Sequence, residues 1–144
     1  MLPTLNQITD MWEKDAVIKT HQYSSAAMET AVLHAKYLKM LTQYENTLRQ
    51  LTRQKERLKL SLYDYYDRKA EPEMYERKGI VDRKVLVKDM PDWIQADNDM
   101  QQLNDSLDVA RIAVATLKEI LQVVKFRNNA IKSAIEWEKF AAGE

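Results

Sequence analysis

The chain is short of the residues that cross-link or interrupt a polypeptide. Its 144 residues include no cysteine, two glycines and three prolines. The absence of cysteine excludes disulfide bonds and thiolate metal sites, and nothing in the composition points to an oxidising compartment. Because glycine and proline are the strongest helix breakers, their scarcity favours long uninterrupted helices. The composition therefore predicts an all-α protein.

Long apolar runs are also missing. No uncharged apolar stretch reaches about 18 residues, which is the length that a membrane-spanning helix needs. The first residues, Met1-Leu2-Pro3-Thr4, carry neither the basic start nor the apolar core of a secretory signal peptide. We therefore expect a soluble, intracellular protein that does not enter a membrane.

The sequence lacks the motifs of catalysis and cofactor binding. It contains no glycine-rich phosphate-binding loop, and its two histidines, His21 and His34, are not at metal-ligand spacing. Asp64 and Asp67, at one edge of a predicted helix, are typical of a solvated surface rather than of an acid–base pair. We expect no enzyme, no cofactor and no metal.

Two long segments carry apolar residues at alternating steps of three and four, the pattern of a packed helical seam. The first predicts one helix from about residue 24 to about residue 67, capped by Ser24 or Ser25, and the second a helix over about 97–141. A short helix after Thr4 is expected to precede them. The seams are Tyr37, Leu41, Tyr44, Leu48, Leu51, Lys55 (the polar exception), Leu58, Leu62 and Tyr65, and then Met100, Leu103, Leu107, Ala110, Val114, Leu117, Leu121, Val124, Asn128, Ile131 and Ile135.

The segment between the two seams has a different composition. Residues 68–91 contain all but one of the prolines and are dense in charge. They predict an irregular connector that can include a small hairpin around Lys78-Gly79 and a short extended segment at 85–87. Asp89 is a suitable cap for a short helical turn that ends near Ala96.

Two long helices and a connector predict a helical hairpin, with residues 1–144 forming a single helical domain. Residues 112–124 are apolar on more than one stripe, and an arc this wide needs more than one partner helix. We expect residues 89–144 to drive self-association, whereas the alternative is a contact with the N-terminal helix around Ile8 and Trp12. Asn128 is a plausible specifier of register. The assembly residues predicted are Leu107, Val114, Leu117, Leu121, Val124, Asn128, Ile131 and Ile135.

The net charge of zero conceals a block pattern: residues 34–88 carry +6 and residues 89–110 carry −6. Tyrosines lie within the basic block. Cations neutralise phosphates and exposed rings stack on bases, so the combination suits single-stranded nucleic acid. Residues 24–88 therefore form the predicted DNA-binding part. The alternative is that the two blocks neutralise each other and the tyrosines pack on the connector. The DNA-binding residues predicted are Lys36, Lys39, Arg57, Lys59, Tyr63, Tyr66, Arg68, Lys69, Arg77 and Lys78.

Several short motifs occur together in an order that is typical of one family. They are Leu33-His34-Ala35-Lys36-Tyr37-Leu38, Asp64-Tyr65-Tyr66 after a basic run, Arg77-Lys78, and Ala130-Ile131-Lys132 followed by Phe140-Ala141-Ala142-Gly143. On these motifs, and over nearly its whole length, the sequence resembles the UvsY-type recombination mediator proteins of T-even-like bacteriophages.

The resemblance implies a small helical protein that is not an enzyme and forms a ring-like homo-oligomer through its C-terminal region. It implies binding to single-stranded DNA, to a RecA-like phage recombinase and to the phage single-stranded DNA-binding protein, in the cytoplasm of the infected host bacterium. The implied role is to load the recombinase onto coated strands.

The family's Lys-x-Arg pair before Asp-Tyr-Tyr is implicated in DNA binding. It aligns here with Leu60 and Leu62, and the nearest cations are Arg57 and Lys59. The alternative function is a structural coiled-coil scaffold without nucleic-acid binding.

Overall fold

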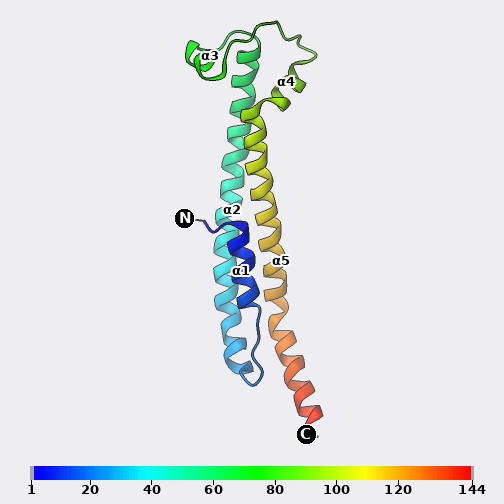
Figure 1. Ribbon diagram of the computed structural model, residues 1–144. Helices are drawn as coiled ribbons and strands as arrows, with labels where there is room; N and C mark the ends of the chain where they lie inside the picture. Colours follow the sequence, from blue (N-terminus) through cyan, green and yellow to red (C-terminus); the bar gives the residue numbers. More distant parts are fainter. Residues whose placement is uncertain (1, 144) are drawn as a thin grey trace. The chain divides into compact units, whose positions relative to one another are not determined.

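The computed structural model describes residues 2–143, and within them the chain forms five helices and no strand (Figure 1). The all-α prediction is confirmed. The helices are α1 (Leu5–Asp15), α2 (Tyr23–Tyr66), α3 (Pro72–Lys78), α4 (Met90–Ala96) and α5 (Asn98–Ala141).

The two long helices have nearly the predicted bounds. Each has 44 residues without glycine or proline, so nothing interrupts its backbone hydrogen bonds. Ser24 and Ser25 lie inside the first turn of α2 rather than at its cap, which corrects that detail. After α2 the backbone of Arg68 is left-handed (φ 64°) and the amide of Lys69 donates to Asp64 O at 2.8 Å, which closes the helix end.

The connector is more ordered than the sequence predicted. Where a hairpin around Lys78-Gly79 was an option, the chain forms α3, which starts with Pro72 in its first turn and ends at Gly79 (φ 96°). Proline suits a first helical turn and glycine suits a left-handed end, so the two helix breakers delimit this helix instead of preventing it. The short turn predicted before Ala96 is α4, and no strand forms at 85–87.

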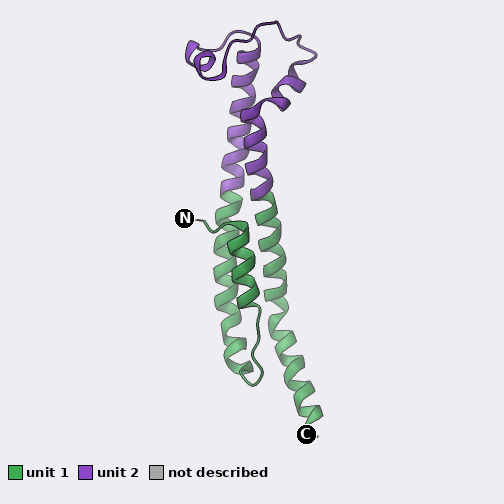
Figure 2. Ribbon diagram, viewed as in Figure 1, with its two compact units in different colours: residues 1–46, 110–144 green, residues 47–109 purple. Residues whose placement is uncertain are grey.

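The chain divides into two compact units, each built on part of α2 and part of α5 (Figure 2). Unit 1 comprises Met1–Asn46 and Ala110–Glu144, and unit 2 comprises Thr47–Val109. The predicted functional parts, 24–88 and 89–144, divide the chain at the connector instead, and that functional division stays a prediction.

In unit 1, α1 packs with α2 and α5. Thr4 and Gln7 form a reciprocal capping box that starts α1, Ile8 is fully buried, and the Trp12 ring meets the Tyr37 ring edge-on at 5.5 Å. Ala113 and Ile120 of α5 are buried, while Ile112 and Val123 are exposed. The N-terminal helix therefore belongs to the core of unit 1, as the alternative interpretation of the wide apolar arc expected.

The residues predicted to drive assembly lie mainly inside the protomer. Leu107, Val114, Leu117, Val124 and Ile131 are buried, and Leu121 and Ile135 are partly buried. The amide oxygen of Asn128 accepts a hydrogen bond from the Thr30 hydroxyl at 2.8 Å, so Asn128 links α5 to α2 within one chain. The seam is thus a core seam within the protomer, and its predicted role in assembly stays a prediction.

Unit 2 has a core of its own where the connector packs on the long helices. The buried centre of this core consists of Leu62, Val85, Met90, Ile94 and Met100. Four partly buried residues pack against it, namely Leu58, Tyr66, Met74 and Trp93. Because Val85 and Met90 come from the connector, this segment is held in place by the hydrophobic effect and not only by its short helices.

Candidate nucleic-acid interface

A buried ion-pair cluster joins the basic and acidic blocks in unit 2. The Lys78 ammonium lies 2.9 Å from a carboxylate oxygen of Asp97 and 2.9 Å from one of Asp99, and Arg77 lies 3.2 Å from Asp99. Only 11% of the Lys78 side chain and 3% of the Asp97 side chain are exposed. Part of the basic block is therefore neutralised inside the protein, as the alternative interpretation expected.

This cluster shifts the pKa of each of its buried members. Burial acts to raise the pKa of Asp97, but hydrogen bonds from Tyr66 and Lys78 hold it below its ordinary value. Burial acts to lower the pKa of Lys78, but the hydrogen bonds to Asp97 and Asp99 raise it above its ordinary value. The Lys78 hydrogen bond is also the main cause that lowers the pKa of Asp99. All three groups are therefore charged at neutral pH.

The tyrosines at the end of α2 have separate roles. The Tyr66 hydroxyl donates to Asp97 at 2.6 Å, and its ring packs against Tyr65 and Trp93. The Tyr65 hydroxyl donates to the carbonyl of Gly79 at 2.9 Å. These two rings hold the connector, whereas Tyr63 is exposed to solvent.

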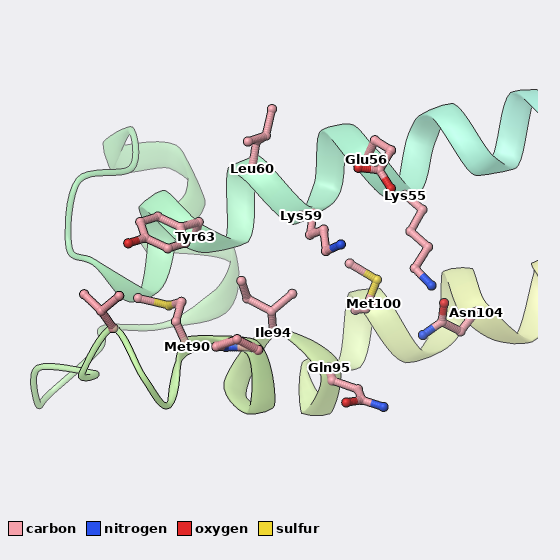
Figure 3. A pocket seen from close by; sticks show the side chains of 12 residues that line it. Lys55, Glu56, Lys59, Leu60, Tyr63, Met90, Ile94, Gln95, Met100 and Asn104 are labelled. Atoms are coloured by element: carbon pink, nitrogen blue, oxygen red, sulfur yellow. The ribbon is translucent and has the colours of Figure 1, made fainter.

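An apolar groove of about 700 Å³ lies beside Tyr63, within unit 2 (Figure 3). Lys55, Lys59 and Tyr63 line it from one face of α2, at helical steps of four residues. Met90, Ile94 and Met100 line it from α4 and the start of α5, and its remaining lining residues are Glu56, Leu60, Val87, Pro91, Gln95 and Asn104. Figure 3 shows the ammonium groups of Lys55 and Lys59 reaching from α2 toward the opposite wall.

The structure separates the ten predicted DNA-binding residues into two sets. Five are engaged within the protein: Lys36 with Asp15, Tyr66 with Asp97, Lys69 with Asp67, Arg77 with Asp99, and Lys78 with Asp97 and Asp99. Among residues 2–143, the other five have no hydrogen-bond or ion-pair partner for their side chains: Lys39, Arg57, Lys59, Tyr63 and Arg68.

Only two of the predicted residues meet in the groove, namely Lys59 and Tyr63. Arg57 is two positions from Lys59 and is therefore on the opposite face of α2. Lys36 and Lys39 belong to unit 1. Lys55, which the sequence placed in the seam, is a third member of the groove. The four-residue spacing of Lys55, Lys59 and Tyr63 could have revealed it.

The groove combines two surfaces with different chemistry. Its wall on α2 presents two cations and an aromatic ring, and its opposite wall consists of the exposed Val87 side chain beside the buried Met90, Ile94 and Met100. Cations attract phosphates, and an aromatic ring next to apolar side chains accepts the flat face of an unpaired base. Stacked bases inside a duplex do not offer that face, so the arrangement favours a single strand.

Neither a metal site nor a membrane-spanning helix is found in the part of the chain that the structure describes. Within residues 2–143, no group of three or more His, Cys, Asp or Glu side chains could hold a metal ion. None of the helices there is long and apolar enough to cross a membrane.

Residues 11–144 match the profile of a family described as "Recombination, repair and ssDNA binding protein UvsY". The chain belongs to the UvsY family. The match spans α2 to α5, and therefore includes every lining residue of the groove.

Solved UvsY structures have the same fold. Two crystal structures of the bacteriophage T4 recombination mediator protein UvsY, lattice types II and IV, superpose with a TM-score of 0.83 at 20% sequence identity. The first covers 97% of this chain and 98% of the T4 chain, and the second covers 96% and 99%. A third, lattice type I, has a TM-score of 0.81 at 19% identity over 93% and 98%. No curated protein sequence was found to match.

Proposed function

We propose that this protein is a recombination mediator that binds single-stranded DNA in the groove of unit 2. The observation that carries the proposal is the convergence of Lys55, Lys59 and Tyr63 on an apolar wall. The family is described by recombination and single-stranded DNA binding, and the similar T4 protein is a recombination mediator protein; both support this proposal. The mediator would load a RecA-like recombinase onto strands coated by single-stranded DNA-binding protein, in the cytoplasm of an infected bacterium.

In the proposed complex, Lys55 and Lys59 attract successive phosphates while a base stacks on Tyr63 and faces the exposed Val87 side chain. Stacking of this kind contributes about 1–3 kcal/mol per base and accepts any base. Two cations alone bind weakly and lose affinity as salt rises. A binding surface of this size therefore becomes effective when several copies of it act on one strand.

We further propose that copies assemble, in a ring-like homo-oligomer, through the outer face of α5 in unit 1. Ile112, Val123, Phe126 and Trp137 lie on one side of that helix, and about half or more of each side chain is exposed. Monomeric proteins rarely leave large contiguous apolar patches in solvent. This face is on the opposite side of α5 from the buried seam that includes Leu117 and Val124.

The DNA site is tested by single-strand affinity at several salt concentrations. Replacing Lys55 and Lys59 together with alanine removes both groove cations, so affinity should fall about tenfold and the salt slope should decrease by about 1.4. Arg57→Ala, on the opposite face of the same helix, is the matched control and should change affinity less. Tyr63→Ala should weaken binding about 5- to 150-fold, as expected for loss of one stacked base.

Equal affinity and salt slope in the double variant and the parent protein would place the DNA elsewhere. If the parent protein does not bind single-stranded DNA at micromolar concentration, the scaffold function is favoured. The ion pairs between the basic and acidic blocks would then have a structural role only.

The assembly face is tested by the mass of the protein in solution. Val123→Asp with Phe126→Asp places two charges on the exposed face of α5, so light scattering should show a lower mass while circular dichroism remains helical. Lys132→Glu changes an exposed residue elsewhere on α5 and should leave the mass unchanged. An unchanged mass in the double variant would contradict this face as the contact between copies.

A further inference from the structure

Arg127 is a buried cation with an incomplete set of partners. Only 4% of its side chain is exposed. Its Nη1 donates to the backbone oxygen of Asp15 at 3.3 Å, its Nη2 lies 4.0 Å from a carboxylate oxygen of Glu29, and its Nε has no hydrogen-bond partner among the described residues. A buried guanidinium normally has its charge and most of its five donors matched, so this arrangement requires an explanation.

The two carboxylates around Arg127, those of Asp15 and Glu29, do not supply the missing partner. One oxygen of Asp15 already accepts hydrogen bonds from Lys36 at 2.6 Å and from the Tyr37 hydroxyl at 2.8 Å. Glu29 is beyond hydrogen-bond distance, and 66% of its side chain is exposed, so it can turn into solvent. The charge of Arg127 is therefore only partly compensated within unit 1.

Arg127 lines a polar pocket of about 240 Å³ at the turn between α1 and α2, within unit 1. Lys14 and Lys19 also line the pocket, so three cations surround it. Gln22 and Ser25 line it from the beginning of α2, where the first amides of a 44-residue helix have no partner one turn earlier in the helix. A helix N-terminus carries a partial positive charge, which adds to that of the cations.

These features together select an anion. The two carboxylates at the pocket are Asp15, which Lys36 compensates, and Glu29, so positive charge is in excess. The pocket is about a third of the volume of the groove in unit 2, and its lining is mainly polar, which suits a compact oxyanion better than a base. Arginine and helix amides present several N–H donors in fixed directions, the geometry that phosphate oxygens accept.

We propose that this pocket of unit 1 binds a phosphate group, held by Arg127, Lys14 and Lys19 at the start of α2. The phosphate can come from a free phosphate or nucleotide, or from the 5′-terminal phosphate of a DNA strand. Both sources offer the same tetrahedral anion, and the experiments below separate them.

The first experiment uses inorganic phosphate alone and is independent of DNA binding. Calorimetric titration in chloride buffer of constant ionic strength should show a dissociation constant of about 1 mM. This binding is weaker than the maximum affinity that a ligand of five non-hydrogen atoms can reach, so the expected value is physically attainable. Lys14→Gln with Lys19→Gln changes only exposed side chains and should weaken binding about five- to tenfold. Lys132→Gln, an exposed lysine of unit 1 outside the pocket, is the control and should bind phosphate as the parent does.

Arg127→Lys keeps the charge but loses the planar set of donors, and should weaken binding further if circular dichroism shows that it folds. The absence of phosphate binding by the parent protein would overturn the proposal. Equal binding by the Lys14/Lys19 double variant would overturn it as well.

The second experiment compares oligonucleotides with and without a 5′-phosphate, and this arm rests on the proposed DNA binding. A preference for the phosphorylated strand that is lost in the Lys14/Lys19 double variant would assign the pocket to the strand end. Equal affinity for both strands, together with phosphate binding, would assign it to free phosphate or a nucleotide. The Lys55/Lys59 variant weakens the groove but should keep its phosphate affinity, which distinguishes failure of one site from failure of the other.

Discussion

In unit 2 a lysine and an aspartate are buried together, whereas in unit 1 the ion pair between Lys36 and Asp15 lies nearer the surface. Lys78 and Asp97 are almost inaccessible, but 40% of the Lys36 side chain is exposed at its contact with Asp15. Val123 and Phe126 of unit 1 are about half exposed. Large apolar side chains are exposed in unit 2 as well, as Leu60 and Val87 show, so the contrast lies in how deeply each ion pair is buried.

The buried ion pair of unit 2 is suited to holding the groove in one arrangement. A buried ion pair is seldom the most stabilising use of a core, but it fixes one arrangement because each charge requires its partner. In unit 2 that arrangement holds the connector whose residues Met90 and Ile94 form one wall of the groove. In unit 1 the exposed apolar side chains are available to another molecule. In the proposed function, unit 2 provides the binding surface and the outer face of α5 in unit 1 provides the assembly surface.

The largest effect is expected from Lys78→Met. This change leaves Asp97 buried without its cation, and breaking a buried pair destabilises by about 3–5 kcal/mol. Denaturant unfolding followed by the fluorescence of Trp93, in a variant with Trp12 and Trp137 replaced by phenylalanine, measures the loss in unit 2. Lys84→Met, an exposed lysine of the connector, is the control and should change stability by less than about 0.5 kcal/mol.

A loss below about 0.5 kcal/mol in Lys78→Met would show that the cluster does not stabilise unit 2. The contrast between the buried ion pair of unit 2 and the more exposed pair of unit 1 would then have no consequence for stability.

A smaller effect is expected from acid. Asp97 and Asp99 have pKa values below the ordinary 3.8, so the stability they contribute is fully present above pH 3.8 and is lost as pH falls through their lower values in the folded protein. Lys78 has the opposite dependence, because its pKa is raised above 10.5 and its contribution is lost only above that pH. Trp93 fluorescence should therefore report weakening of unit 2 below pH 3.8, and Lys78→Met should show less of this dependence.

The smallest effect is expected from Lys36→Met in unit 1. Its ion pair with Asp15 is partly exposed, so water screens the charges and the loss should be about 0–1 kcal/mol. Thermal unfolding compared with the parent protein measures it. A loss as large as that of Lys78→Met would remove the contrast between the two units.

The long helices and their seams were predictable, because a strict three-and-four spacing over many turns has few alternatives. Lys55 already stood out as the one polar member of its seam. The connector was less predictable, because its conformation depends on contacts between distant residues. Val85 is buried against Leu62, and Lys78 pairs with Asp97, yet neither relation follows from local spacing.

The sequence predicted the kinds of residue in the candidate site, but not which individual residues line it. The sequence identified a basic, tyrosine-rich stretch, yet it could not say which cations would be used inside the protein. Arg77 and Lys78 were expected to meet DNA, and the structure pairs them with Asp99 and Asp97. The opposite wall of the groove, around Met90 and Met100, also lay outside any local motif because it comes from separate segments.

Two tyrosine hydroxyls that donate to aspartates also give each unit an optical reporter. Burial, and then the hydrogen bonds to Asp15 and Asp97, raise the pKa of Tyr37 in unit 1 and of Tyr66 in unit 2 far above the ordinary 10. In alkali these two phenols should remain neutral until their unit opens. The absorbance of newly formed tyrosinate would then record the opening of each unit without an added label.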